Sequence, residues 1–129
     1  MLERVKSLGC RVLVVEDESS SREGLAMLLE NQGFEVAVAE EGSVAIRALE
    51  SGFEPDVILT DLMMPNMSGW QLHDVLKNRS RWADIPILVL CGMSEAQRGD
   101  LQIEGSFEKP IQVSELIERI RQVCGLAAL

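Results

Sequence analysis

The sequence predicts an α/β fold in which a parallel β-sheet lies between layers of helices. Short apolar runs rich in β-branched residues recur along the chain, and they are continuous rather than alternating, as in strands buried on both faces. The segments between these runs have the period of amphipathic helices, and the connections are short. Such an alternation of strands and helices indicates right-handed crossovers between parallel strands.

Four strands are predicted where Val, Ile, Leu and Ala follow one another without a charge, at residues 12–15, 36–39, 57–59 and 87–90. A fifth candidate, residues 105–108, is too short to be assigned from its pattern alone. The runs follow one another in a chain whose intervening segments are long enough for one helix each.

Helices are predicted where apolar residues recur at intervals of three and four, in residues 19–32, residues 43–51, the segment after Ser68, and residues 113–123. A glycine follows the first, second and last of these segments and supplies a stop. Residues 92–101 have poor helical periodicity, so a helix between the last two strands is expected to be short or irregular.

The length and composition fit one domain that spans residues 1–129. With 129 residues, 47% of them hydrophobic and 26% charged, the chain can bury a core without a disulfide or a metal. Its formal net charge of −9 is repelled by phosphate backbones and by anionic lipid, so neither nucleic acid nor membrane is expected as a partner.

The three cysteines, Cys10, Cys91 and Cys124, are widely separated and form no C-x-x-C pair, so neither a zinc site nor a disulfide framework is indicated. Reduced thiols in a cytoplasmic protein are the expectation. Residues 1–9 lack the apolar region of a signal peptide, and no run approaches the length of a membrane span.

Acidic residues follow two of the predicted strands. Glu16 and Asp17 come after the first strand, and Asp61 comes after the third. If these strands are neighbours, the three carboxylates meet at the carboxyl edge of the sheet, where ligands bind in such folds. Mg²⁺ prefers oxygen ligands and relieves their mutual repulsion, while Lys109 follows the fifth candidate strand and adds a positive charge. A carboxylate in this setting can act as a nucleophile toward phosphorus.

The sequence resembles the receiver domain of two-component response regulators, the CheY-like family. Three blocks carry the likeness: residues 14–18 (VVEDE), residues 55–65 (PDVILTDLMMP) with Gly69, and residues 109–110 (KP). The likeness extends over residues 11–123. It implies a flavodoxin-like, doubly wound sheet of five parallel strands in the order 2-1-3-4-5, flanked by five helices.

The resemblance also implies the roles of individual residues. Glu16 and Asp17 match the acidic pair that holds Mg²⁺, or Mn²⁺ in its place. Asp61 matches the phosphoacceptor, and Met63 matches the position whose backbone carbonyl completes the metal shell. Lys109 matches the lysine that contacts the phosphoryl group. No organic cofactor is implied.

Two positions depart from the family pattern. The fourth strand of the family ends in Ser or Thr, whose hydroxyl bonds the phosphoryl oxygen, and Cys91 stands at this switch position. A thiol is a weaker donor. The aromatic residue expected three places before the lysine is replaced by Ser106, and Phe107 is expected to face the other side of its strand. The stretch from 91 to 109 is also shorter than usual.

The function implied is signal transduction in a phosphorelay. A histidine kinase or a histidine phosphotransfer protein would phosphorylate Asp61, and the phosphoprotein would then switch its contacts with a downstream protein. The module would be no enzyme beyond its own phosphorylation and slow autodephosphorylation. A phosphohydrolase with an aspartyl nucleophile carries a second Asp two residues on, where this chain has Met63.

Two alternatives stay open. The chain is either a pseudo-receiver, an interaction module that does not respond to phosphate, or a phosphorylated switch, and it either stands alone or belongs to a larger regulator or hybrid kinase. A flavodoxin-like cofactor binder is disfavoured because no hydroxyl-rich phosphate loop follows the first strand. His73, the single histidine, is expected at the surface.

Overall fold

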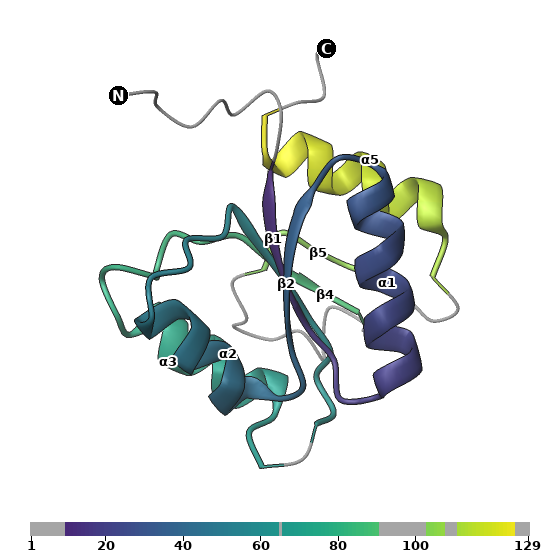
Figure 1. The fold of residues 1–129 in the computed structure, drawn as a ribbon. Coiled ribbons are helices and arrows are strands. Elements are labelled where there is room, and N and C mark those ends of the chain that lie inside the picture. The colour runs from purple at the N-terminus through teal and green to yellow at the C-terminus, as the bar shows by residue number, and fades with distance from the viewer. Residues whose placement is uncertain (1–9, 65, 91–102, 108–110, 126–129) are drawn as a thin grey trace.

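The protein is described by a computed structural model that covers residues 10–64, 66–90, 103–107 and 111–125 (Figure 1). Five parallel strands form one sheet in the order β2-β1-β3-β4-β5. Their bounds are β1 Arg11–Val15, β2 Glu35–Ala39, β3 Val57–Thr60, β4 Ile87–Val89 and β5 Gly105–Ser106. The predicted fold class and strand order are therefore confirmed, and the weak fifth candidate is a strand of two residues.

Four helices lie within the described residues: α1 Ser19–Asn31, α2 Gly42–Glu50, α3 Gly69–Lys77 and α5 Val113–Val123. All four coincide with predicted helices to within about a residue at their starts. The helix expected between β4 and β5 falls on residues 91–102, which lie outside the described part of the chain.

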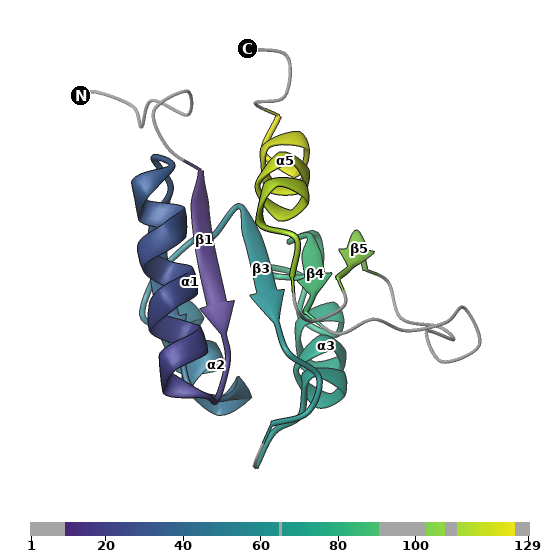
Figure 2. The ribbon, with the colours of Figure 1, turned by 90° about the vertical axis from the view of Figure 1, so that its right-hand side faces the viewer.

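The helices cover both faces of the sheet, α1 and α5 on one side and α2 and α3 on the other (Figures 1 and 2). Alternate residues of β1 point to opposite faces, so each face has its own core. Leu13 and Val15 pack with Leu49 of α2 and Leu72 of α3 on one side. On the other side, the core contains Val12, Val14, Leu29, Leu116 and Ile120. Burial on both faces explains why the strands read as continuous apolar runs.

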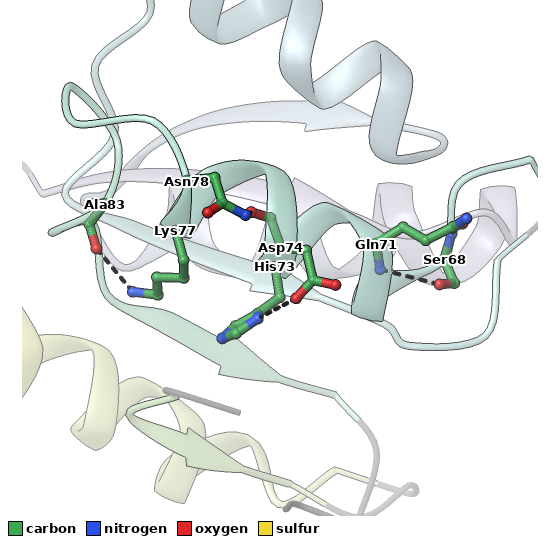
Figure 3. A network of polar contacts seen from close by, with 7 residues as sticks. All are labelled: Ser68, Gln71, His73, Asp74, Lys77, Asn78 and Ala83. Atoms are coloured by element: carbon green, nitrogen blue, oxygen red, sulfur yellow. Dashed lines mark hydrogen bonds and ion pairs between the residues drawn. The ribbon is translucent and has the colours of Figure 1, made fainter. Parts of the chain in front are cut away.

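Local sequence signals set the helix ends. Glu18 is the N-cap of α1, where its carboxylate accepts the Ser21 N–H at 2.7 Å. α3 begins with a capping box in which Ser68 and Gln71 each accept the other's backbone N–H (Figure 3). Gly33 follows α1 at φ 93°, a left-handed conformation that favours glycine, and turns the chain into β2.

His73 is not at the surface, so that expectation is wrong. Its side chain lies on α3 with 8% of its area exposed, and its Nδ1 is 3.3 Å from a carboxylate oxygen of Asp74 (Figure 3). The same helix continues its polar contacts at its end, where Lys77 donates to the carbonyl of Ala83 at 2.9 Å. The apolar period of α3 did not predict whether His73 is buried, because it depends on how the helix packs against the rest of the fold.

Cys10 and Cys124 are paired as a disulfide between the residue before β1 and the C-cap of α5, with Cα atoms 6.0 Å apart. The expectation of unpaired thiols is therefore wrong for this pair. Their separation of 114 residues in sequence gave no pairing signal, because the contact arises only when α5 packs on the sheet beside β1. Cys91 lies outside the described residues.

Candidate functional site

The carboxyl ends of β1 and β3 lie next to each other because the two strands pair directly, with Val15 opposite Thr60 (Figure 2). The residues that follow these ends, Glu16 and Asp61, continue the ladder. The Asp61 N–H bonds the carbonyl of Val15 at 3.0 Å, and the Glu16 N–H bonds the carbonyl of Ala39 at 3.0 Å. Their backbones are thus fixed by the sheet rather than by a loop.

Three carboxylates converge at this edge. Glu16, Asp17 and Asp61 each offer an oxygen atom, and these atoms lie within 4.8 Å of one another. Glu16 is buried, Asp61 has 9% of its area exposed, and Asp17 is exposed to solvent. The geometry therefore brings together the three acids that the sequence predicted as a site. Two of them, Glu16 and Asp61, are buried, and Asp17 lies at the surface.

Glu18, the next acid, has a different role. Its carboxylate caps α1 and also accepts the Ser20 hydroxyl at 2.5 Å. The Ser20 hydroxyl contributes most, and the Ser21 hydrogen bonds next, to holding the pKa of Glu18 at about 2, below its ordinary value of 4.5. The three acids after β1 therefore have two roles: Glu16 and Asp17 lie beside Asp61, and Glu18 caps α1.

Backbone groups orient two of the carboxylates. Glu16 accepts the N–H of Glu18 at 3.2 Å, and Oδ1 of Asp61 accepts the N–H of Met63 at 3.3 Å. Both contacts span two residues, so each loop fixes its own acid. In both contacts a carboxylate oxygen accepts and a backbone N–H donates, which limits rotation of the side chain.

Arg22 is a residue at this edge that the sequence pattern did not indicate. Its guanidinium donates to the carbonyls of Glu16 at 2.9 Å and of Asp17 at 3.3 Å. It ties the loop after β1 to the first turn of α1 and brings a positive charge close to the acids. The sequence could not predict the role of Arg22, because its acceptors are backbone carbonyls, which every residue has.

Gly69, the first residue of α3, is required by a close approach of two backbones. A Cβ atom at this position would meet the carbonyl oxygen of Asp61 and lie 2.8 Å from Cα of Leu62. The Gly69 N–H also bonds the carbonyl of Leu62 at 2.9 Å. α3 therefore packs directly on the segment that carries Asp61.

Of the other residues that the sequence singled out, Met63, Ser106 and Phe107 lie within the described part of the chain. The side chain of Met63 is 75% exposed. Lys109 and Cys91 lie outside the described residues. Ser106 is exposed on β5, and Phe107 packs partly buried with the core beneath α1 and α5, so these neighbours do point in different directions, as expected.

The donor set fits a hard divalent cation. Three carboxylate oxygens within 4.8 Å of one another match the oxygen ligands that Mg²⁺ and Mn²⁺ take, and the exposed Asp17 leaves one side open to solvent. Among the residues that the structure describes, no sulfur or imidazole ligand belongs to this cluster, unlike the ligand sets of zinc sites. In the described part of the chain, no helix is both long and apolar enough to cross a bilayer.

A model of the response regulator receiver domain matches residues 12–121 of the chain. The phosphate regulon transcriptional regulatory protein PhoB of Escherichia coli K12 is 38% identical over 117 residues, which are 88% of this chain and 51% of PhoB. The chain thus spans about half the length of the curated relatives it matches.

Solved structures share the fold. The receiver domain of a signal transduction histidine kinase from Syntrophus aciditrophicus superposes with a TM-score of 0.82 at 27% identity and covers 90% of both chains. The receiver domain of sensor histidine kinase PA1611 from Pseudomonas aeruginosa PAO1 gives a TM-score of 0.78 at 24% identity, with 91% of this chain and 98% of that one covered. In that protein a magnesium ion is coordinated in the active site cleft, while the likeness to this chain concerns the fold alone.

Proposed function

The chain belongs to the family of response regulator receiver domains, and from this premise we propose that it is a signalling switch that accepts a phosphoryl group on Asp61 in the presence of Mg²⁺. The observation that supports this most is the convergence of Glu16, Asp17 and Asp61 within 4.8 Å at the carboxyl edge of the sheet. An isolated acid after a strand is often a cap or a loop residue, but three from two strand ends make a ligand set.

In this proposal Glu16 and Asp17 hold the cation together with Asp61 and the backbone carbonyl of Met63. Bound there, Mg²⁺ or Mn²⁺ supplies positive charge that offsets the carboxylates and stabilises charge on the transferring phosphoryl group. The Met63 N–H holds one oxygen of Asp61 and so orients the carboxylate.

The chemical step is a displacement at phosphorus. A carboxylate oxygen of Asp61 forms a bond to the phosphorus of a phosphohistidine, the phosphorus–nitrogen bond breaks, and the imidazole leaves with the bonding electrons. We propose that Lys109 contacts the phosphoryl oxygens and that Cys91 occupies the switch position. Hydrolysis of the acyl phosphate releases inorganic phosphate and returns the carboxylate.

We further propose a cytoplasmic histidine kinase or histidine phosphotransfer protein as the donor and a protein as the target. Residues 1–129 would fold as one receiver domain with its core in residues 11–123. PhoB is named a transcriptional regulator and is about twice as long as the region matched, so an effector domain in the same protein is compatible with this assignment. The domain itself carries a net charge of −9, which disfavours direct contact with nucleic acid.

A phosphodonor experiment tests the proposal. The full chain is incubated with acetyl phosphate and Mg²⁺, and its intact mass is measured. One phosphoryl adduct is expected in the native chain and none in Asp61→Asn or with EDTA. Asp84→Asn is the matched control, because it makes the same chemical change at an exposed position between α3 and β4.

The second candidate is a pseudo-receiver, favoured by the exposed Ser106 in the position where the family has an aromatic residue. It predicts no adduct under any of these conditions. An adduct that persists in Asp61→Asn would exclude Asp61 as the acceptor and contradict both candidates.

A further inference from the structure

The loop from β3 to α3 carries Asp61 at its start and Met63 two residues later, so its position decides where a metal shell can form. Its own contacts are short-range: the Met63 N–H bonds Asp61, and the Gly69 N–H bonds Leu62 at 2.9 Å. The first contact holds the beginning of the loop, and the second joins that beginning to the first residue of α3. The second half of the loop is held by a different part of the chain.

That part is the start of α2, where Glu41 occupies the N-cap position with an extended backbone (φ −163°, ψ 173°). An acid at this position usually accepts a backbone N–H of the first turn, as Glu18 does on α1. The side chain of Glu41 makes no such cap bond. Its Oε1 accepts the Ser43 hydroxyl at 2.6 Å, and its Oε2 accepts the side-chain amide of Asn66 at 2.8 Å.

The contact to Asn66 joins residues 25 apart in sequence and reaches the loop at a strained position. Asn66 has φ 65°, the left-handed region that Asn tolerates better than other residues with a Cβ atom. The bonds from Ser43 first, and from Asn66 second, lower the pKa of Glu41, so the carboxylate accepts in its charged form.

Gly42 and Met67, the residues that follow Glu41 and Asn66, are also in contact. A Cβ atom on Gly42 would lie 2.7 Å from Cγ and Sδ of Met67, so the side chain of Met67 lies directly on the first turn of α2. Asn66 and Met67 of the loop are thus fixed by Glu41 and Gly42 at the start of α2, one pair by a hydrogen bond and the other by packing.

We propose that Glu41 is a positioning residue of the metal site: through Asn66 it fixes the loop between β3 and α3 and thereby the distance of the Met63 carbonyl from Glu16, Asp17 and Asp61. This inference rests on the proposed function. Mg²⁺ demands nearly ideal octahedral geometry, so a displacement of a few tenths of an ångström in one ligand weakens binding. Glu41 itself does not touch the cation. Its carboxylate acts at the far end of the loop.

Calorimetric titration of the full chain with Mg²⁺ tests the proposal. Glu41→Ala and Asn66→Gly each weaken Mg²⁺ binding roughly threefold, the effect of one exposed hydrogen bond. Glycine at position 66 adopts φ 65° without strain and lacks the amide, and it also leaves the backbone of the loop freer. The double variant binds no more weakly than the single ones, because both remove the same bond. Glu41→Gln keeps an acceptor for Asn66 and restores most of the affinity.

Glu40→Ala is the matched control, since Glu40 is an exposed acid one residue away, and its binding constant should equal that of the native chain. Melting temperatures in EDTA show whether the variants act through overall stability. Native-like affinity in Glu41→Ala, additive effects in the double variant, or a loss of affinity that follows the loss of stability would each overturn the positioning role. A native chain that binds no Mg²⁺ would instead refute the proposed function, and this inference with it.

Discussion

Gly69→Ala tests whether the backbone of α3 is in contact with the segment that carries Asp61. The added methyl group would meet the carbonyl oxygen of Asp61 and lie 2.8 Å from Cα of Leu62, whereas nonbonded carbons prefer separations of about 3.5–4.0 Å. Both neighbours are backbone atoms, held by β3 and by the Gly69–Leu62 hydrogen bond, so they cannot rotate away. The contact can be relieved only if α3 or the loop moves.

The expected loss of stability is the cost of overpacking, about 1–3 kcal/mol, reduced by the preference of a helix for Ala over Gly, at most about 1 kcal/mol. A net loss of about 1 kcal/mol lowers the urea midpoint by roughly 0.5 M for a slope near 2 kcal/mol/M. Gly24→Ala is the control: Gly24 lies exposed within α1 with no atom within 4 Å of a Cβ, so the same change should stabilise by about 1 kcal/mol.

Urea unfolding followed by far-ultraviolet circular dichroism gives both midpoints, and calorimetry gives the Mg²⁺ affinity of the folded variants. Gly69→Ala should lose Mg²⁺ affinity as well as stability, because the displaced segment carries Asp61. The reasoning would be refuted by a Gly69→Ala midpoint at or above that of the native chain. A lower urea midpoint for Gly69→Ala and a higher one for Gly24→Ala would show that the atoms around each glycine, and not the loss of glycine itself, decide the change in stability.

Three further changes have expected outcomes. Because the pKa of Glu18 is lowered to about 2 from 4.5, its contribution to stability is complete above pH 4.5 and is lost as pH falls toward 2; Glu18→Gln should remove this part of the acid dependence of unfolding. Mg²⁺ should raise the melting temperature of the native chain in proportion to the logarithm of its concentration, and Asp17→Asn should abolish most of this rise. Non-reducing peptide mapping should find Cys10 linked to Cys124, and reduction should lower the melting temperature because the link closes a loop of over a hundred residues, worth up to about 5 kcal/mol.

Each of these has its own control and contrary result. For Glu18, the control is Glu23, an exposed acid within α1, and an equal effect of Glu23→Gln would show that the N-cap position has no particular importance. For Mg²⁺, a rise that survives in Asp17→Asn would place the cation elsewhere. For the disulfide, three reactive thiols in the unfolded, unreduced chain would show that the pair is not linked.

The order of the elements was readable from the sequence because it depends on local properties. Continuous apolar runs at residues 12–15 and 57–59 indicated strands buried on both faces, and the stripe of residues 113–123 indicated α5, since periodicity and side-chain type act over a few neighbouring residues. Glu16, Asp17 and Asp61 were found for the same reason: each stands within two residues of the end of a strand.

Tertiary structure alone decided which of these elements meet. Residue patterns by themselves left open whether β1 lies beside β3, and on that pairing depends the distance between Glu16 and Asp61. Two side-chain positions could not be read from the sequence either: His73 is buried, and Glu41 bonds to Asn66 instead of capping its own helix. Such contacts depend on the packing of segments far apart in the chain, and a sequence records which side chains are present but not which of them the packed helices and strands bring within a few ångströms of each other.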